Sequence, residues 1–289
     1  RLQMKDDLGG LAKKLEITPE EALMKLKENY DGYHFTSPSP DIYNPFSLLN
    51  AFADGKFGSY WFGSGTPTYL VKMLDKFGVK PSEIGRRQLK SSVFDAPTET
   101  MTDAVPLLYQ SGYITIKDYN KMLDLYTLDI PNKEVRLGLM ESLLPYYVNN
   151  KTPEATTMVA YLFYDIQNGD MDAALHRLQE FLSTIPYCDN TRFEGHYQQV
   201  FYIIFSLLGY YVDVEVRTPR GRVDIVLRTK TTLYVMELKL DKSAGEAMEQ
   251  IDLKNYPERF ALCGLPVVKV AVSFDSERCT IGDWEIINA

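Results

Sequence analysis

Three charged residues interrupt a segment that otherwise has the alternating pattern of two β-strands. The segment is GRVDIVLRTKTTLYVMELKL, residues 221–240, and the three residues are Asp224, Glu237 and Lys239. Acidic side chains are uncommon in strands, and a charge that faces a core needs a partner. The three residues therefore either face water on one side of a sheet or converge on a chemical site.

The strand pattern predicts that the two carboxylates lie side by side. Successive side chains of a strand point to opposite faces, so Asp224 shares a face with Val226, and Glu237 points the same way as Lys239. The residues between Asp224 and Glu237 suffice for a strand end, a tight turn and an antiparallel return. We therefore expect Asp224, near the start of one strand, beside Glu237, near the end of the next.

Two carboxylates and an ammonium at a sheet end indicate metal-assisted chemistry. Mg²⁺ prefers oxygen ligands and is commonly held by one or two carboxylates, water and a substrate phosphate. The predicted ligands of Mg²⁺ (or Mn²⁺) are Asp224, Glu237 and the backbone carbonyl of Leu238. A bound cation relieves the repulsion of the carboxylates and stabilises the charge of a phosphoryl displacement. Lys239 would position or deprotonate the attacking water, or neutralise the phosphate.

Two further polar residues are placed by helical periodicity. Glu194, on a predicted helix from roughly 191 to 208, is in register with an apolar stripe and so points toward the sheet. Gln250, on the helix that begins at SAGEAMEQ, lies beside a second apolar stripe. Gln250, and Tyr256 at the end of the same helix, could reach a phosphate or orient Lys239.

A purely structural interpretation competes with the metal site. An Asp followed by Glu-x-Lys occurs by chance in many strands, where the Glu and Lys form a solvent-side pair of little energetic value. The surroundings favour the metal site, because an inward Glu precedes the sheet, a glycine-containing turn precedes Asp224 and a Gln-bearing helix follows Lys239.

The element pattern predicts an α/β chain (α+β overall) in three parts. Residues 1–92 read as helical, and residues 93–150 read as helix, strand, turn, strand and helix, a winged-helix-like connector without a basic face. Residues 151–289 begin with helices and continue in the order αβββαββ, which describes a mixed sheet.

Composition limits the classes of function. The 289 residues carry a formal charge of −8, which argues against general salt-driven attraction to nucleic acid but allows an enzyme that holds it locally around a metal ion. Three cysteines suit reduced thiols in the cytoplasm, and three histidines argue against a histidine-built zinc site. No apolar run is long enough to span a membrane, and no phosphate-loop motif for ATP binding occurs.

The residues discussed above resemble the PD-(D/E)XK nuclease superfamily over roughly residues 170–289. Asp224 falls on its metal-binding Asp, Glu237 and Lys239 on its E-x-K pair, and Glu194 and Gln250 on its helical positions. Val223 stands where the motif usually has Pro. The resemblance implies a nucleic-acid substrate, with DNA favoured over RNA.

Upstream segments resemble a second domain type. YDGYHF, YNPFSLLNAF and YWFGSGTP look like the end of the AAA-ATPase-like domain that precedes such a nuclease-like domain in a family of large bacterial proteins. This resemblance implies that an N-terminal ATPase core lies outside the chain.

Three functional hypotheses follow. The first is metal-dependent phosphodiester hydrolysis, and the second is a binding module that keeps the nuclease fold without cleaving. The third is a regulatory arm of an AAA-type ATPase. Under the third, the aromatic loop at 30–46 is a candidate docking surface, although its residues alone favour a small hydrophobic core.

Overall fold

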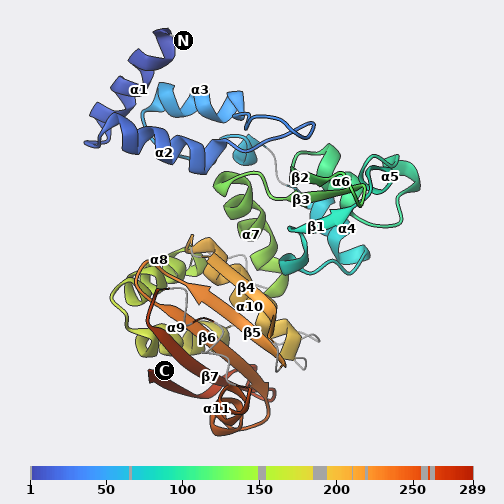
Figure 1. The fold of residues 1–289 in the computed structure, drawn as a ribbon. Coiled ribbons are helices and arrows are strands. Elements are labelled where there is room, and N and C mark those ends of the chain that lie inside the picture. Colours follow the sequence, from blue (N-terminus) through green and yellow to red (C-terminus); the bar gives the residue numbers. More distant parts are fainter. Residues whose placement is uncertain are drawn as a thin grey trace. The chain divides into compact units, whose positions relative to one another are not determined.

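The structure, a computed structural model, describes residues 2–64, 67–148, 154–184, 194–209, 211–218, 221–254, 260 and 264–288. The chain divides into two compact units, Arg1–Ser142 and Leu143–Ala289, which are described separately below (Figure 1). Helices and two sheets occur together, so the predicted mixed α/β class is confirmed. The predicted division into three parts stays a prediction.

The first unit begins with four helices, two of which start at capping side chains. The first helices are α1 (Leu2–Lys14), α2 (Pro19–Tyr30), α3 (Pro45–Asp54) and α4 (Thr68–Lys76). Thr18 caps α2 in a reciprocal capping box with Glu21, and Asn44 caps α3, each followed by proline at the first helical position. The buried core shared by α1, α2 and α3 consists of Leu11, Leu26, Tyr30, Leu48 and Ala51.

The second half of this unit contains a small antiparallel sheet. Its elements are β1 (Arg87–Leu89), α5 (Ser91–Phe94), α6 (Val105–Gln110), β2 (Thr115–Asn120), β3 (Leu125–Asp129) and α7 (Lys133–Tyr147), which extends past the unit boundary. The strands lie in the order β1-β3-β2. The predicted succession of helix, hairpin and helix therefore matches α6, β2–β3 and α7.

The second unit is built on a five-stranded sheet. Its helices are α8 (Glu154–Gln167), α9 (Met171–Ser183), α10 (Glu194–Leu207) and α11 (Ala244–Leu253). Its strands are β4 (Tyr211–Thr218), β5 (Gly221–Arg228), β6 (Leu233–Leu240), β7 (Val267–Asp275) and β8 (Thr280–Asn288). They are hydrogen-bonded in chain order, with β6 and β7 parallel and the other pairs antiparallel. From α10 onward this is the predicted αβββαββ order.

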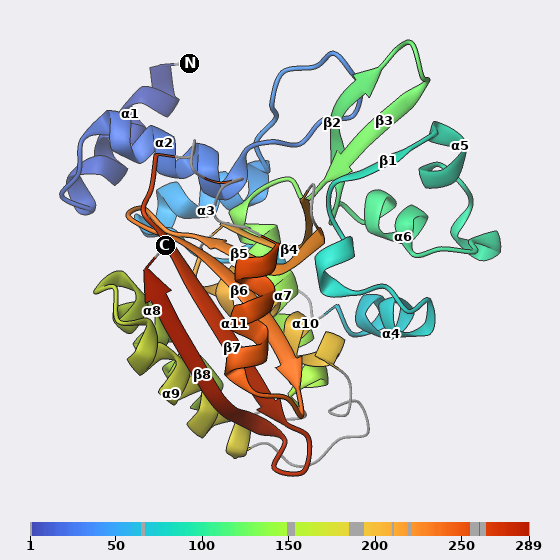
Figure 2. The ribbon, with the colours of Figure 1, turned by 60° about the horizontal axis from the view of Figure 1, so that its bottom comes forward.

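Helices cover both faces of this sheet (Figure 2). On one face, Ala247 and Met248 of α11 pack against Val226 and Val235. On the other face, Phe201 of α10 contacts the ring of Phe274. Phe274 pairs with Leu240 of β6, and even-numbered residues of β6 face away from Val235 and Glu237. The face that carries Glu237 is thus the α11 face.

No helix among the described residues is long and apolar enough to cross a membrane.

Candidate active site

The end of the β5–β6 ladder places the two carboxylates together. Ile225 of β5 pairs with Met236 of β6, and Asp224 and Glu237 are the next residues on the two strands. Because they continue an antiparallel register, their side chains lie on the same face. Asp224 Oδ2 accepts a hydrogen bond of 2.9 Å from the backbone N–H of Leu238. The carboxylate of Asp224 therefore accepts a hydrogen bond from the main chain of β6 at the point where the β5–β6 pairing ends.

Glu237 is a buried acid with one satisfied and one unsatisfied oxygen. The residue is 1% exposed. Its Oε1 accepts hydrogen bonds from Lys239 Nζ, at 3.0 Å, and from the amide of Gln250. Its Oε2 is buried as well, and no group in the described part of the chain donates a hydrogen bond to it. A buried carboxylate oxygen without a donor is a position that a cation can fill.

Burial raises the pKa of both acids, and a neighbouring acid adds to each shift, Asp224 for Glu237 and Glu194 for Asp224. Removal from water, followed by the nearby charge of Asp224, raises the pKa of Glu237 to about 7, although Lys239 opposes this. Burial also raises the pKa of Asp224, against the lowering effect of the Leu238 N–H. Burial alone would lower the pKa of Lys239, but attraction to Glu237 outweighs it and the pKa is raised. The two carboxylates of Asp224 and Glu237 are electrostatically unfavourable side by side, and an added positive charge would stabilise them.

Glu194 approaches the same site from the start of α10. It is half-buried, and the helix continues with the buried rings of Tyr197, Phe201 and Phe205, as the predicted stripe requires. The charge of Glu194 raises the pKa of both Asp224 and Lys239, so it lies within electrostatic range of the carboxylate pair. Residues 191–193 of the predicted helix lie outside the described residues.

Sequence reasoning missed Gln198. Its side chain is 6% exposed, and its Nε2 donates a 3.1 Å hydrogen bond to the backbone carbonyl of Asp224. The bond joins α10 to β5 at the residue that carries the first carboxylate. The available signal was the pair of amides directly before the apolar run VFYIIF (residues 200–205), because a buried amide needs a partner.

The donor set fits a hard divalent cation. Within the described ranges there is no group of three His, Cys, Asp or Glu side chains that could hold a metal ion, so protein ligands would be two carboxylates and main-chain oxygen. The N–H of Leu238 faces β5, and a strand residue presents its N–H and carbonyl to the same neighbour, so the Leu238 carbonyl projects to that side also. Mg²⁺ commonly uses few protein oxygens and completes its shell with water and phosphate.

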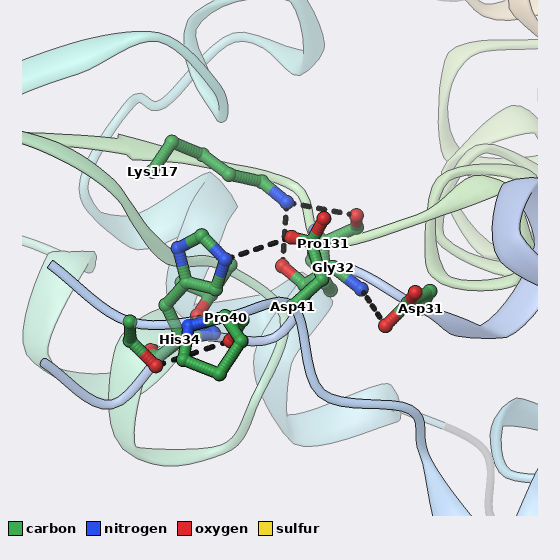
Figure 3. A network of polar contacts seen from close by, with 9 residues as sticks. Asp31, Gly32, His34, Pro40, Asp41, Lys117 and Pro131 are labelled. Carbon is green, nitrogen blue, oxygen red and sulfur yellow. Dashed lines mark hydrogen bonds and ion pairs between the residues drawn. The ribbon is translucent and has the colours of Figure 1, made fainter. Parts of the chain in front are cut away.

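A second polar network, in the first unit, has a structural role (Figure 3). Lys117 Nζ donates hydrogen bonds to the carbonyls of Gly32 and Pro131, and His34 Nε2 pairs with Asp41 at 2.7 Å. These contacts hold the loop after α2 against β2 and the start of α7. Part of the aromatic loop is core, because Tyr30 is fully buried, whereas Phe35 is 68% exposed beside a cavity of about 670 Å³.

Comparisons with known proteins relate part of the second unit to a nuclease superfamily. Residues 192–284 match the family model of the PD-(D/E)XK nuclease superfamily, and the five-stranded mixed sheet agrees with that fold. The resemblance predicted from Asp224, Glu237 and Lys239 is therefore confirmed for this region. The AAA-ATPase-like resemblance of the upstream segments stays a prediction.

One curated relative is similar over most of the chain. It is a protein of Azotobacter chroococcum mcd 1 described as "Uncharacterized protein in vnfD 5'region", 32% identical over 269 residues. The match covers 88% of this chain and 50% of the relative, so the chain spans about half of that protein's length. No solved structure matches the chain significantly.

Proposed function

We propose that the second unit hydrolyses phosphodiester bonds of nucleic acid with the help of a divalent cation. The observation that carries this proposal is the buried carboxylate of Glu237, with its unsatisfied Oε2, beside Asp224 in a region that matches a nuclease superfamily. A stable protein rarely keeps a buried, half-satisfied acid next to another acid unless a ligand completes the site.

Each residue of the site has a proposed role. Asp224, Glu237 and the Leu238 carbonyl would hold Mg²⁺ or Mn²⁺. The bound cation would lower the pKa of a water molecule and stabilise the charge that develops on the phosphate. Gln250 holds Glu237 Oε1 in place through its amide. Glu194 would serve as an auxiliary acidic group that interacts with Lys239 and Asp224 through its charge.

Lys239 is the residue proposed to act on the attacking water or the phosphate. Its ammonium is paired with Glu237, and its side chain is 12% exposed. A cation bound to Glu237 would weaken its ion pair with Lys239, and the ammonium would then be available to an anionic substrate. A raised pKa keeps Lys239 protonated, which favours phosphate neutralisation and water orientation over proton abstraction.

The biological setting is proposed on the resemblance alone. DNA is favoured over RNA as the substrate, and the chain would belong to a larger cytoplasmic protein with an N-terminal ATPase core. The relative's greater length is compatible with further domains in proteins of this kind.

The test is cleavage of plasmid, linear duplex and single-stranded substrates in Mg²⁺ or Mn²⁺. We expect cleavage by the wild type, and none with EDTA or with Asp224→Asn. Asp224→Asn is close in shape, so folding should be retained and checked by thermal unfolding. Cleavage that persists in the variant would reject this site. Absence of cleavage by the well-folded wild type would favour an inactive binding or regulatory module.

A further inference from the structure

Two cationic residues, Arg222 and Lys254, lie near the carboxylate pair of Asp224 and Glu237. Arg222 precedes Asp224 by two positions on β5, and its charge reaches the Asp224 carboxylate. Lys254 follows Gln250 by one helical turn at the end of α11. Its N–H still donates to the Gln250 carbonyl, at 3.2 Å, so the two residues share one side of the helix. Gln250 in turn contacts Glu237.

Both cations are within electrostatic range of the site. The charge of Arg222 acts to lower the pKa of Asp224, and the charge of Lys254 acts to lower the pKa of Glu237, although burial outweighs both effects. The two cations thus stand beside different carboxylates, one on a strand and the other on a helix.

The side chain of Arg222 remains accessible to an anion. It is 57% exposed and contacts Glu215 Oε1 at 3.4 Å. An exposed ion pair of this kind is worth at most about 1 kcal/mol, so a phosphate could replace or share the contact. Arginine also binds phosphate oxygens in a bidentate manner.

We propose that Arg222 and Lys254 bind backbone phosphates that flank the phosphate to be cleaved. This inference rests on the proposed nuclease function. A chain with a net charge of −8 has no general attraction for a polyanion, so a few cations close to the site must provide the local attraction. Arg222 beside Asp224 and Lys254 beyond Gln250 provide two such contacts, and they mark where the substrate backbone crosses the site.

Salt dependence tests the inference. The probe is a fluorescein-labelled 20-base-pair DNA duplex in EDTA, and its affinity is measured by fluorescence anisotropy at several salt concentrations. For Arg222→Gln and for Lys254→Gln, we expect the slope of log affinity against log salt to become shallower by roughly 0.9 each. In Mn²⁺, KM should rise severalfold while kcat changes little.

Two variants act as controls. Lys230→Gln removes an exposed cation beyond the opposite end of β5, and it should leave the slope unchanged. Arg222→Lys keeps the charge, so it should keep most of the slope. If Arg222→Gln and Lys254→Gln leave the salt slope unchanged, as Lys230→Gln should, while the wild type binds and cleaves DNA, the inference is wrong and the proposed function stands. If the wild type neither binds nor cleaves nucleic acid, both are wrong.

Discussion

At the scale of single residues, the buried carboxyl group of Glu237 is an electrostatically unfavourable feature of the second unit. One oxygen is held by Lys239 and Gln250, and the other is buried without a donor among the described residues. Burying a charge without full compensation is unfavourable, so the folded protein prefers Glu237 protonated, as its pKa of about 7 reflects. A bound divalent cation would remove this penalty.

The first prediction concerns Glu237→Gln. The amide keeps the shape and removes the charge, so we expect the affinity for Mn²⁺ and the cleavage rate to fall by roughly a hundredfold or more. In EDTA near neutral pH, the same variant should be about as stable as the wild type, because removing the carboxylate charge beside Asp224 offsets the loss of the ion pair with Lys239. Calorimetric titration and thermal unfolding measure the two effects. A strongly destabilised variant would mean that Glu237 is a structural ion-pair partner of Lys239.

The second prediction is a pH dependence of stability in EDTA. The pKa of Glu237 is raised on folding, so its contribution is fully present below the unfolded-state pKa of 4.5 and is lost as pH rises through about 7. The wild type should lose on the order of 3 kcal/mol of unfolding free energy from this group between those values. Denaturant unfolding across pH 4.5 to 8 gives the curve, and its difference from the Glu237→Gln curve isolates the group. If the unfolding free energies of the wild type and of Glu237→Gln change in parallel with pH, the raised pKa of Glu237 is contradicted.

Side-chain alternation predicted much of this site, and tertiary contacts supplied the rest. The period of two along β5 and β6 was enough to expect Asp224 beside Glu237 and Lys239 beside Glu237. The lack of a donor to Glu237 Oε2 could not be predicted, because it depends on which oxygen receives the hydrogen bonds of Gln250 and Lys239. The partner of Gln198 could not be predicted either, since it is a main-chain carbonyl on another element.

At the scale of elements, α10 and α11 position the site from opposite faces of the sheet. α11 begins with a Ser243–Glu246 capping box and brings Gln250 to Glu237. α10 brings Glu194 into range and fixes the main chain of Asp224 through Gln198. The order and type of these elements were predictable from apolar periodicity, whereas their contacts with individual site residues depended on packing.

The third prediction tests the link between α10 and β5. Gln198→Leu leaves the Asp224 carbonyl without its side-chain donor, which should lower the unfolding free energy by about 1–3 kcal/mol. Asp224 would also be less well oriented, so Mn²⁺ affinity should fall by roughly 10-fold to 100-fold. Ser206→Ala, a buried polar change farther along α10, is the matched control and should leave Mn²⁺ affinity unchanged. Equal Mn²⁺ affinities in the two variants would show that Gln198 is only structural.

At the scale of the whole molecule, the chain consists of two compact units, and the candidate site draws all its residues from the second. The mixed sheet could be predicted because five alternating segments surround a helix in a recognisable order. The boundary at 142/143 could not, because it falls inside the continuous helix α7.

The fourth prediction is that the second unit binds metal alone. A chain of residues 131–289 keeps α7 whole and contains Glu194, Gln198, Asp224, Glu237, Lys239 and Gln250. We expect it to unfold cooperatively and to bind Mn²⁺ within about threefold of the full chain, because no site residue is removed. Circular dichroism and calorimetry measure these properties. Cooperative folding without Mn²⁺ binding would show that the first unit contributes to the site.

The most direct measurement is a calorimetric titration of Mn²⁺ into the wild-type chain and into Asp224→Asn at neutral pH. We expect saturable binding to the wild type, with proton release because Glu237 is partly protonated there, and a loss of at least about a hundredfold in affinity in the variant. Equal binding by the two proteins, or no binding by a folded wild type, would contradict the assignment of Asp224 and Glu237 as a divalent-cation site.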